Sequence, residues 1–267
     1  LVANKFDLLP KSTKPQKVLD WLLREAEKYS FPVLSTHIIS SKKGYFIDEL
    51  VNVIDLARND RDVYFLGVAN VGKSSLINAI LKRFSGRVDD LISESMIPGT
   101  TLNEIKIDFF DDGKYLIDTP GLINEKDTLN QILPLSYKKI LPKNEIKPLT
   151  FQIFNDNVLF LGGLAYLKIK TLEKISIITY TSNELYIHRA KLENLDKLLK
   201  EQLGYLLTPP SPDEIKNIKY AKKIINFDGV NKKTIWFSSF GFVSVIGKCQ
   251  IEVNYIDKTD LYITNAM

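Results

Sequence analysis

The segment Gly67–Ser74 constrains this 267-residue chain more than any other feature, because its sequence GVANVGKS fits the pattern G-x-x-x-x-G-K-[ST]. The apolar run Asp62–Leu66 predicts a strand before it, and apolar periodicity over Lys73–Phe84 predicts a helix after it. Glycines let successive backbone N–H groups converge on phosphate oxygens, and the following helix N-terminus favours an anion. A chance glycine turn is the alternative. The strand and helix context favours a phosphate-binding loop, in which Lys73 contacts the phosphates and the Ser74 hydroxyl binds Mg²⁺.

A second motif, Asp118-Thr119-Pro120-Gly121, follows a predicted strand at Lys114–Ile117 and begins 45 residues after Lys73. Beside a phosphate-binding loop, such an aspartate reaches the Mg²⁺ shell, and the glycine N–H senses a γ-phosphate. Between the two motifs lies Pro98-Gly99-Thr100-Thr101, at the end of a long polar stretch. Its hydroxyls can complete the metal coordination. We expect Mg²⁺ to be bound by Ser74, Thr101 and Asp118.

Base specificity is predicted at the start of the chain. Asn4-Lys5-Phe6-Asp7 matches N-K-x-D, in which the aspartate accepts hydrogen bonds from N1–H and the 2-amino group of guanine. Adenine lacks those donors, so a carboxylate at this place rejects ATP. Ser40-Ser41-Lys42 then follows a predicted strand where a guanine-binding S-A-K loop would lie, and we expect the Ser41 N–H to point at guanine O6.

The order of these motifs is unusual, because the base motifs precede the phosphate-binding loop. In this order the chain resembles the YqeH-type circularly permuted GTPases, which are implied to assist ribosome biogenesis. In the second half Asn183–Leu185, His188–Glu193, Leu206–Pro210 and Phe237–Gly241 resemble the C-terminal domain of that family. The family's N-terminal Cys-cluster zinc module is not in this sequence, and the strand that delivers Asn4 lacks its start, so we expect a fragment.

The resemblance implies a complete guanine nucleotide site. GTP or GDP would be bound by Asn4, Lys5, Asp7, Ser40, Ser41, Lys42, Asn70, Val71, Gly72, Lys73, Ser74, Ser75 and Thr100. Hydrolysis would depend on Lys73, Asn70, Thr101 and Gly121.

Hydrolysis is expected to be slow. Many GTPases place a glutamine after the switch II glycine to orient the attacking water, but here that residue is Leu122. In some GTPases with an apolar residue at this place, a P-loop asparagine helps to hold K⁺. Asn70 occupies the matching position, either as a K⁺ ligand or merely as a residue that shapes the loop. Arg87 is a further candidate for an arginine finger, although a solvated loop arginine is the simpler interpretation.

The remaining elements follow from apolar periodicity. Helices are predicted at Lys14–Lys28 (with Thr13 as N-cap), Ile47–Ala57 and Arg189–Tyr205. Strands are predicted at Phe31–Leu34, His37–Ile39, Asn103–Phe110, Phe151–Phe154, Val158–Leu161, Leu164–Lys170, Ile175–Tyr180, Ile235–Phe237, Val243–Ile246 and Ile251–Ile256. We therefore expect an α/β P-loop domain over residues 1–145, with a mostly parallel sheet and helices on both faces, and a mainly β domain over residues 146–267.

Charge and composition give the second domain a candidate partner. Residues 1–145 hold 20 Lys and Arg against 20 Asp and Glu, whereas residues 146–267 hold 16 against 12. Lysines and aromatic side chains are interleaved among its strands, which suits RNA, although solvated lysines and core aromatics are the alternative for any one residue. Permutation makes switch II the last catalytic element before this domain, so Leu122–Ile140 would transmit nucleotide-dependent movement.

Two functions from different classes follow. The first is a GTP-driven switch that assists small ribosomal subunit assembly and binds ribosomal RNA through its C-terminal domain. The second is a GTP-gated protein-binding adaptor that does not contact RNA. The single cysteine, Cys249, excludes an internal disulfide, and no signal peptide or membrane span is visible, so a reducing cytoplasmic location is expected.

Overall fold

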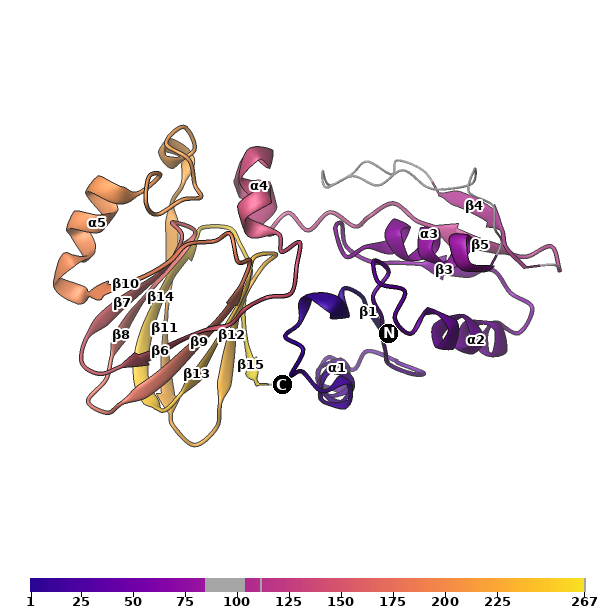
Figure 1. Ribbon diagram of the computed structural model, residues 1–267, viewed down its shortest axis with the longest axis horizontal. Coiled ribbons are helices and arrows are strands. Elements are labelled where there is room, and N and C mark those ends of the chain that lie inside the picture. Colours follow the sequence, from indigo (N-terminus) through magenta and orange to yellow (C-terminus); the bar gives the residue numbers. More distant parts are fainter. Residues whose placement is uncertain (85–103, 111, 267) are drawn as a thin grey trace. The chain divides into compact units, whose positions relative to one another are not determined.

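The computed structural model describes residues 1–84, 104–110 and 112–266. They form two compact units, Leu1–Asn124 and Glu125–Ala266 (Figure 1). The division lies earlier than the boundary expected at 145/146, because apolar side chains of the intervening segment, among them Leu129 and Ile140, belong to the core of the C-terminal unit.

The N-terminal unit alternates strands and helices, as an α/β layer does. Its elements are β1 (Val2–Ala3), α1 (Pro15–Lys28), β2 (His37–Ile38), α2 (Ile47–Arg58), β3 (Val63–Phe65), α3 (Lys73–Phe84), β4 (Ile105–Asp108) and β5 (Tyr115–Asp118). Instead of the one mostly parallel sheet that was expected, these strands form two sheets: β1 is parallel to β2 in a two-stranded sheet, and in a three-stranded sheet of order β3-β5-β4 the strand β3 is parallel and β4 antiparallel to β5. Because β3 and β5 run in the same direction, the loops that follow them meet at one edge of the sheet.

Helices α2 and α3 pack against the sheet through one apolar cluster. It contains Ile39, Ile47, Leu50, Leu76, Ile77, Ile80, Leu81, Ile107, Phe110 and Leu116. Ile77, Ile80 and Leu81 are fully buried on one face of α3, at the i, i+3, i+4 spacing of a helix that packs on a sheet. This packing fixes the position of the α3 N-terminus at Lys73 and hence of the loop before it.

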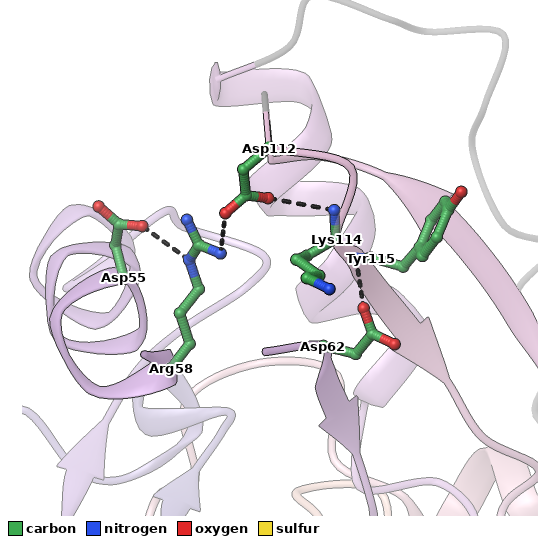
Figure 2. Close-up of polar contacts among 6 residues, drawn as sticks. All are labelled: Asp55, Arg58, Asp62, Asp112, Lys114 and Tyr115. Atoms are coloured by element: carbon green, nitrogen blue, oxygen red, sulfur yellow. Dashed lines mark hydrogen bonds and ion pairs between the residues drawn. The ribbon is translucent and has the colours of Figure 1, made fainter. Parts of the chain in front are cut away.

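Arg58, the last residue of α2, ties this helix to the turn between β4 and β5 (Figure 2). Its Nε donates to Asp55 Oδ1 at 2.9 Å and its Nη1 donates to Asp112 Oδ2 at 2.5 Å, while the guanidinium lies 4.1 Å from the centre of the Phe110 ring. The hydrogen bond from Arg58 lowers the pKa of Asp112. Asp62 Oδ1 accepts from the Tyr115 N–H at 3.0 Å, so the β5 end of the same turn is held from the start of β3.

Two predictions for this unit need correction. Phe31–Leu34 does not form a strand: Pro32 has no N–H to donate to a ladder, and the Phe31 and Leu34 side chains are 59% and 88% exposed. Helix α1 begins at Pro15 with Lys14 at its N-cap, so Thr13 does not cap it. The helix predicted at Lys73–Phe84 is confirmed.

The C-terminal unit consists of two five-stranded antiparallel sheets that share one core. Its strands are β6 (Leu149–Ile153), β7 (Asn157–Leu161), β8 (Ala165–Lys170), β9 (Ile175–Thr181), β10 (Ile187–Lys191), β11 (Tyr220–Asp228), β12 (Lys233–Phe237), β13 (Gly241–Ile246), β14 (Lys248–Ile256) and β15 (Leu261–Asn265). The first sheet has the order β10-β7-β8-β14-β11 and the second the order β15-β12-β13-β9-β6.

Alternate residues of each strand enter this core, as the two-residue period of a strand requires. On β14, for example, Cys249, Ile251 and Val253 are buried against the opposite sheet. Helix α5 (Leu195–Gln202) covers part of the outer face of the first sheet, where Leu195 packs with Phe160. No helix among residues 1–84, 104–110 and 112–266 is long and apolar enough to cross a bilayer.

The predicted helix Arg189–Tyr205 is wrong at its start. Residues 187–191 form strand β10, which pairs with β7, and the α-helix spans only Leu195–Gln202. Strands β11 and β15 were not predicted, because Lys222 and Lys223 interrupt the apolar pattern of the first and the second is only five residues long.

The segment that leaves the N-terminal unit is fastened to the C-terminal unit by buried polar contacts. Glu214, 5% exposed, accepts hydrogen bonds from the Leu133 N–H, the Ser136 hydroxyl at 2.9 Å and the Ser211 N–H at 2.7 Å. Burial raises the pKa of this carboxyl, but these hydrogen bonds outweigh it and the pKa is lowered. Glu214 thus fixes the start of the short helix α4 (Pro134–Ile140).

We predict that Glu214→Ala lowers the free energy of unfolding by about 2–3 kcal/mol, because three donors lose their charged acceptor. The carboxylate's contribution is present above its unfolded-state pKa and is lost as the pH falls through the lower folded-state pKa. Urea denaturation of Glu214→Ala and of the control Glu201→Ala, an exposed position on α5, measures the difference. Equal stability of the two variants at pH 7 would contradict this role.

Candidate nucleotide-binding site

The predicted phosphate-binding loop lies between β3 and α3, as its sequence requires. Gly72 adopts φ +92°, and a Cβ there would lie 2.5 Å from Asn4 Nδ2, so both backbone conformation and space call for glycine. The Lys73 ammonium donates to the Gly67 carbonyl at 3.1 Å and thus lies over the loop. Burial lowers the pKa of Lys73, and the nearby Asp118 charge opposes that shift. The loop and the N-terminus of α3 can therefore receive an anion.

The side chains of Asn4 and Lys5 bind the phosphate-binding loop itself. Asn4 Nδ2 donates to the Gly72 carbonyl at 3.0 Å, and Lys5 Nζ donates to the Asn70 carbonyl at 2.6 Å. Burial lowers the pKa of Lys5, while the charge of Asp7 raises it. These two residues join segments that lie more than sixty positions apart in the sequence. The N-K-x-D spacing identified the motif in the sequence. It did not show that the Asn4 and Lys5 side chains hold the phosphate-binding loop in position.

Asp7 is held by the loop that contains Ser40. The fully buried Ser40 donates its hydroxyl to Asp7 Oδ1 at 2.6 Å and accepts the Lys43 N–H at 3.0 Å. Nothing in the described part of the chain donates to Asp7 Oδ2, so this oxygen is available to a base. The Ser41 N–H, predicted to point at guanine O6, donates instead to Asn4 Oδ1 at 3.1 Å.

A metal-binding pair is formed by Ser74 and Asp118. The Ser74 hydroxyl donates to Asp118 Oδ2 at 2.8 Å, and Asp118 Oδ1 is buried with no partner among the described residues. Burial raises the pKa of Asp118, against the hydrogen bond from Ser74 and the charge of Lys73. A buried carboxylate oxygen beside a hydroxyl fits Mg²⁺, which prefers hard oxygen ligands and would keep this group ionised.

Switch II lies against the phosphate-binding loop through its backbone. The Leu122 N–H donates to the Gly67 carbonyl at 3.0 Å, and the Ala69 N–H donates to the Leu122 carbonyl at 3.0 Å. A Cβ on Gly121 would lie 3.2 Å from Ala69 Cα, so this approach is close. The Leu122 side chain is 63% exposed and has no group to orient water. Sequence patterns did not indicate this backbone pairing.

The structure brings together most of the predicted site residues. Residues with hydrogen bonds or close contacts around the phosphate-binding loop are Asn4, Lys5, Asp7, Ser40, Ser41, Asn70, Gly72, Lys73, Ser74, Asp118 and Gly121. Val71 lies in the same loop, Ser75 follows on α3, and Lys42 is exposed beside Ser41. Thr100, Thr101 and Arg87 lie outside the described residues.

Two family models match this chain. Residues 62–156 match the family described as 50S ribosome-binding GTPase, and residues 174–267 match the family described as YqeH-like, C-terminal. The chain is 42% identical over 247 residues to the protein named YqeH of Bacillus subtilis, covering 92% of this chain and 66% of that protein.

Two further relatives extend the comparison. The NO-associated protein 1 of Arabidopsis thaliana is 33% identical, over 79% of this chain and 42% of its own length. The small ribosomal subunit biogenesis GTPase RsgA of Pseudomonas fluorescens is 35% identical over 123 residues, which are 46% of this chain and 33% of RsgA. The chain thus spans no more than about two thirds of the length of these relatives.

The site and its chain order define a circularly permuted P-loop GTPase domain, in which the base motif precedes the phosphate-binding loop, followed by a mainly β domain. With both of its domains matched, the chain belongs to the YqeH-like family.

We predict that Gly72→Ala lowers nucleotide affinity by at least about tenfold, since the new Cβ displaces Asn4 from the loop. Gly113→Ala is the matched control: Gly113 also has positive φ, +75°, but no heavy atom lies within 4 Å of its added Cβ. Both variants carry a similar backbone strain of about 1 kcal/mol. Titration with a fluorescent GDP analogue measures the affinities, and equal affinity of the two variants would contradict the argument.

Proposed function

We propose that this chain is a cytoplasmic GTP-hydrolysing switch that assists small ribosomal subunit assembly, with switch II coupled to an RNA-binding C-terminal domain. The observation that carries the proposal is the contact between the N-K-x-D motif and the phosphate-binding loop, which joins base recognition and phosphate binding in one site. The relative RsgA is named a small ribosomal subunit biogenesis GTPase, which supports the assembly role.

Base selection is assigned to Asp7. The Ser40 hydroxyl holds one carboxylate oxygen at 2.6 Å and so fixes the plane of the group. The carboxylate then accepts from N1–H and the 2-amino group of guanine, whereas adenine presents an acceptor at N1 and would leave the carboxylate unpaired. An unpaired buried carboxylate is costly, and this cost rejects ATP.

Hydrolysis requires charge stabilisation rather than a side-chain base. Lys73 places its ammonium at the β- and γ-phosphates, and Ser74 and Asp118 would hold Mg²⁺, with Thr101 as a further expected ligand. Mg²⁺, when bound, neutralises charge on the phosphate oxygens. The Gly121 N–H is assigned to the γ-phosphate. Because Leu122 orients no water, intrinsic turnover is slow and depends on added positive charge.

Asn70 is proposed to hold that added charge as a ligand of K⁺. Its backbone is fixed in the left-handed region, with φ 64°, by the loop, and its carbonyl accepts from Lys5 Nζ. Among the described residues no hydrogen bond is made by its side-chain amide. The amide oxygen is thus free to bind a cation beside the phosphates.

Coupling to the second domain is proposed to run along the chain itself. Lys126 already belongs to the C-terminal unit, where its carbonyl accepts the Asp260 N–H at 2.9 Å. The Asp127 carboxylate accepts the Ser239 hydroxyl at 2.5 Å and the Leu129 N–H at 2.9 Å. Only three residues, Ile123–Glu125, lie between Leu122 and Lys126. This connection is too short to absorb a movement of switch II without moving Lys126.

A second candidate is the GTP-gated protein-binding adaptor, favoured by the outer face of the second sheet. Aromatic rings from neighbouring strands contact one another there. The ring centroids of Tyr180 and Phe242 are 4.5 Å apart in a stacked pair, and those of Trp236 and Phe242 are 4.3 Å apart. The strand positions that alternate with the buried core residues carry no charged side chain on this face. Aromatic-rich, charge-poor surfaces are typical of protein interfaces.

The first test is nucleotide selectivity. We predict tight binding of GDP and GTP with little ATP binding, and a fall in GTP affinity of about 10- to 100-fold in Asp7→Asn, which removes a charged acceptor. The control Asp20→Asn changes an exposed aspartate of α1 and keeps full affinity. If ATP competed equally with GTP in the unmodified chain, the base assignment would be wrong.

The second test addresses K⁺. Single-turnover GTP hydrolysis is predicted to be about tenfold or more faster in KCl than in NaCl, as charge stabilisation of a transition state implies. Asn70→Ala is expected to lose this difference between the two salts, because it removes the proposed K⁺ ligand. Cleavage that is absent in both salts, or equal in both, would overturn the proposed mechanism.

A further inference from the structure

The first sheet of the C-terminal unit has an uncovered part on its outer face, which we name the lysine face. It lies on β8, β14 and β11, beside the part that α5 covers. Strand alternation identifies its members, because Ile169, Ile251 and Phe227 point into the core and their neighbours point out. The lysine face consists of Lys168, Lys170, Lys222, Ile224, Asn226, Lys248, Gln250 and Glu252.

The strand register of β8, β14 and β11 places the central side chains of the lysine face next to one another. Gln250 of β14 lies opposite Lys170 of β8 on one side and opposite Asn226 of β11 on the other. Lys248 precedes Gln250 by two residues on the same strand and the same face. Neighbouring strands lie about 4.8 Å apart and residues two apart lie about 6.8 Å apart, so two lysines flank one amide within a few ångströms.

The charges on the lysine face are only partly neutralised. Lys168 Nζ lies 2.8 Å from Glu252 Oε1, and their hydrogen bond raises the pKa of the lysine and lowers that of the carboxyl. Among the described residues no salt bridge within 4 Å is made by Lys170, Lys222 or Lys248, although the charge of Lys222 also lowers the pKa of Glu252. Asp228, opposite Lys248, is the one further carboxylate on these outward positions. The outward positions of the second sheet, in contrast, are uncharged.

The amides add hydrogen-bonding capacity of a specific kind. Gln250 Nε2 donates to Asn226 Oδ1 at 2.9 Å, which orients both groups. Their pairing leaves the Gln250 carbonyl as an acceptor and the Asn226 amino group as a donor, side by side on an exposed surface. A nucleobase edge that carries a donor beside an acceptor complements this arrangement. Ile224, 57% exposed, adds an apolar contact beside the pair.

We propose that the lysine face is the site at which the C-terminal domain binds single-stranded RNA, an inference that rests on the proposed RNA-binding function. Lys170 and Lys248 bind phosphates on either side of one nucleotide, and the Gln250–Asn226 pair binds the edge of its base. The strand must be single, because paired bases do not present these edges to a flat protein surface. An acidic peptide would satisfy the lysines but leave the amide pair and Ile224 unused.

The experiment measures binding of a fluorescein-labelled single-stranded 12-nucleotide RNA of mixed sequence by anisotropy between about 50 and 200 mM salt. We predict that Lys170→Ala/Lys248→Ala weakens binding about tenfold. It also reduces the slope of log K against log salt by about 1.4, at roughly 0.7 per lost phosphate contact. The matched control is Lys197→Ala/Lys200→Ala, two exposed lysines of α5, with unchanged slope.

The amide pair is tested separately. Gln250→Ala is expected to leave the salt slope unchanged and to reduce the preference among homopolymeric 12-mers of A, C, G and U. Displacement of the RNA by polyglutamate at equal charge concentration would overturn the assignment to RNA.

The outcomes distinguish a failure of the lysine face from a failure of the proposed RNA-binding function. RNA binding that is equally salt-dependent in both lysine variants would show that the domain binds RNA elsewhere, and the lysine face would be wrong. No salt-dependent binding by the unmodified chain would overturn both the face and the proposed RNA-binding function. GDP affinity stays constant in all variants, because no residue of the nucleotide site is changed.

Discussion

Two hydrogen bonds to the carbonyls of the phosphate-binding loop are the contacts on which the nucleotide site depends. Asn4 and Lys5 hold the carbonyls of Gly72 and Asn70 from 68 and 65 positions earlier in the sequence, so the shape of the loop depends on residues near the start of this sequence. Because Gly72 has room for no Cβ beside Asn4, loop and motif constrain each other. Permuting the chain order therefore leaves the site intact, as long as both segments stay in one folded unit.

The sequence predicted which residues lie together around the phosphate-binding loop, because they belong to short motifs with fixed spacing. Glycines at 67 and 72, the pair Lys73–Ser74 and Asp118 each require a particular residue type, and the structure brings them together. The direction of the Ser41 N–H was wrong, since it depends on the conformation of a loop and not on residue identity. The pairing of Leu122 with Gly67 involves backbone only, and no residue pattern reports it.

The C-terminal unit was harder to predict, for a physical reason. Its inward strand residues alternate with long polar side chains, and β11 and β10 carry lysines that weaken the apolar signal. Residues Arg189–Lys191 were assigned to a helix because the leucines that follow have helical spacing, whereas cross-strand pairing with β7 determines their structure. The same alternation leaves the sandwich with two unlike outer faces, one bearing lysines and amides and one bearing aromatic rings.

The backbone bridge between Leu122 and the phosphate-binding loop has a consequence for how the switch moves. One residue supplies both its N–H and its carbonyl to the loop, at 3.0 Å each. Rotation of this segment away from the loop breaks both bonds together, because they share the same short stretch of chain. Breaking both bonds removes the partners of four backbone groups, namely the N–H and carbonyl of Leu122, the Gly67 carbonyl and the Ala69 N–H. A movement of Leu122 away from the loop therefore costs two backbone hydrogen bonds at once, whereas a movement in which the loop follows Leu122 keeps both.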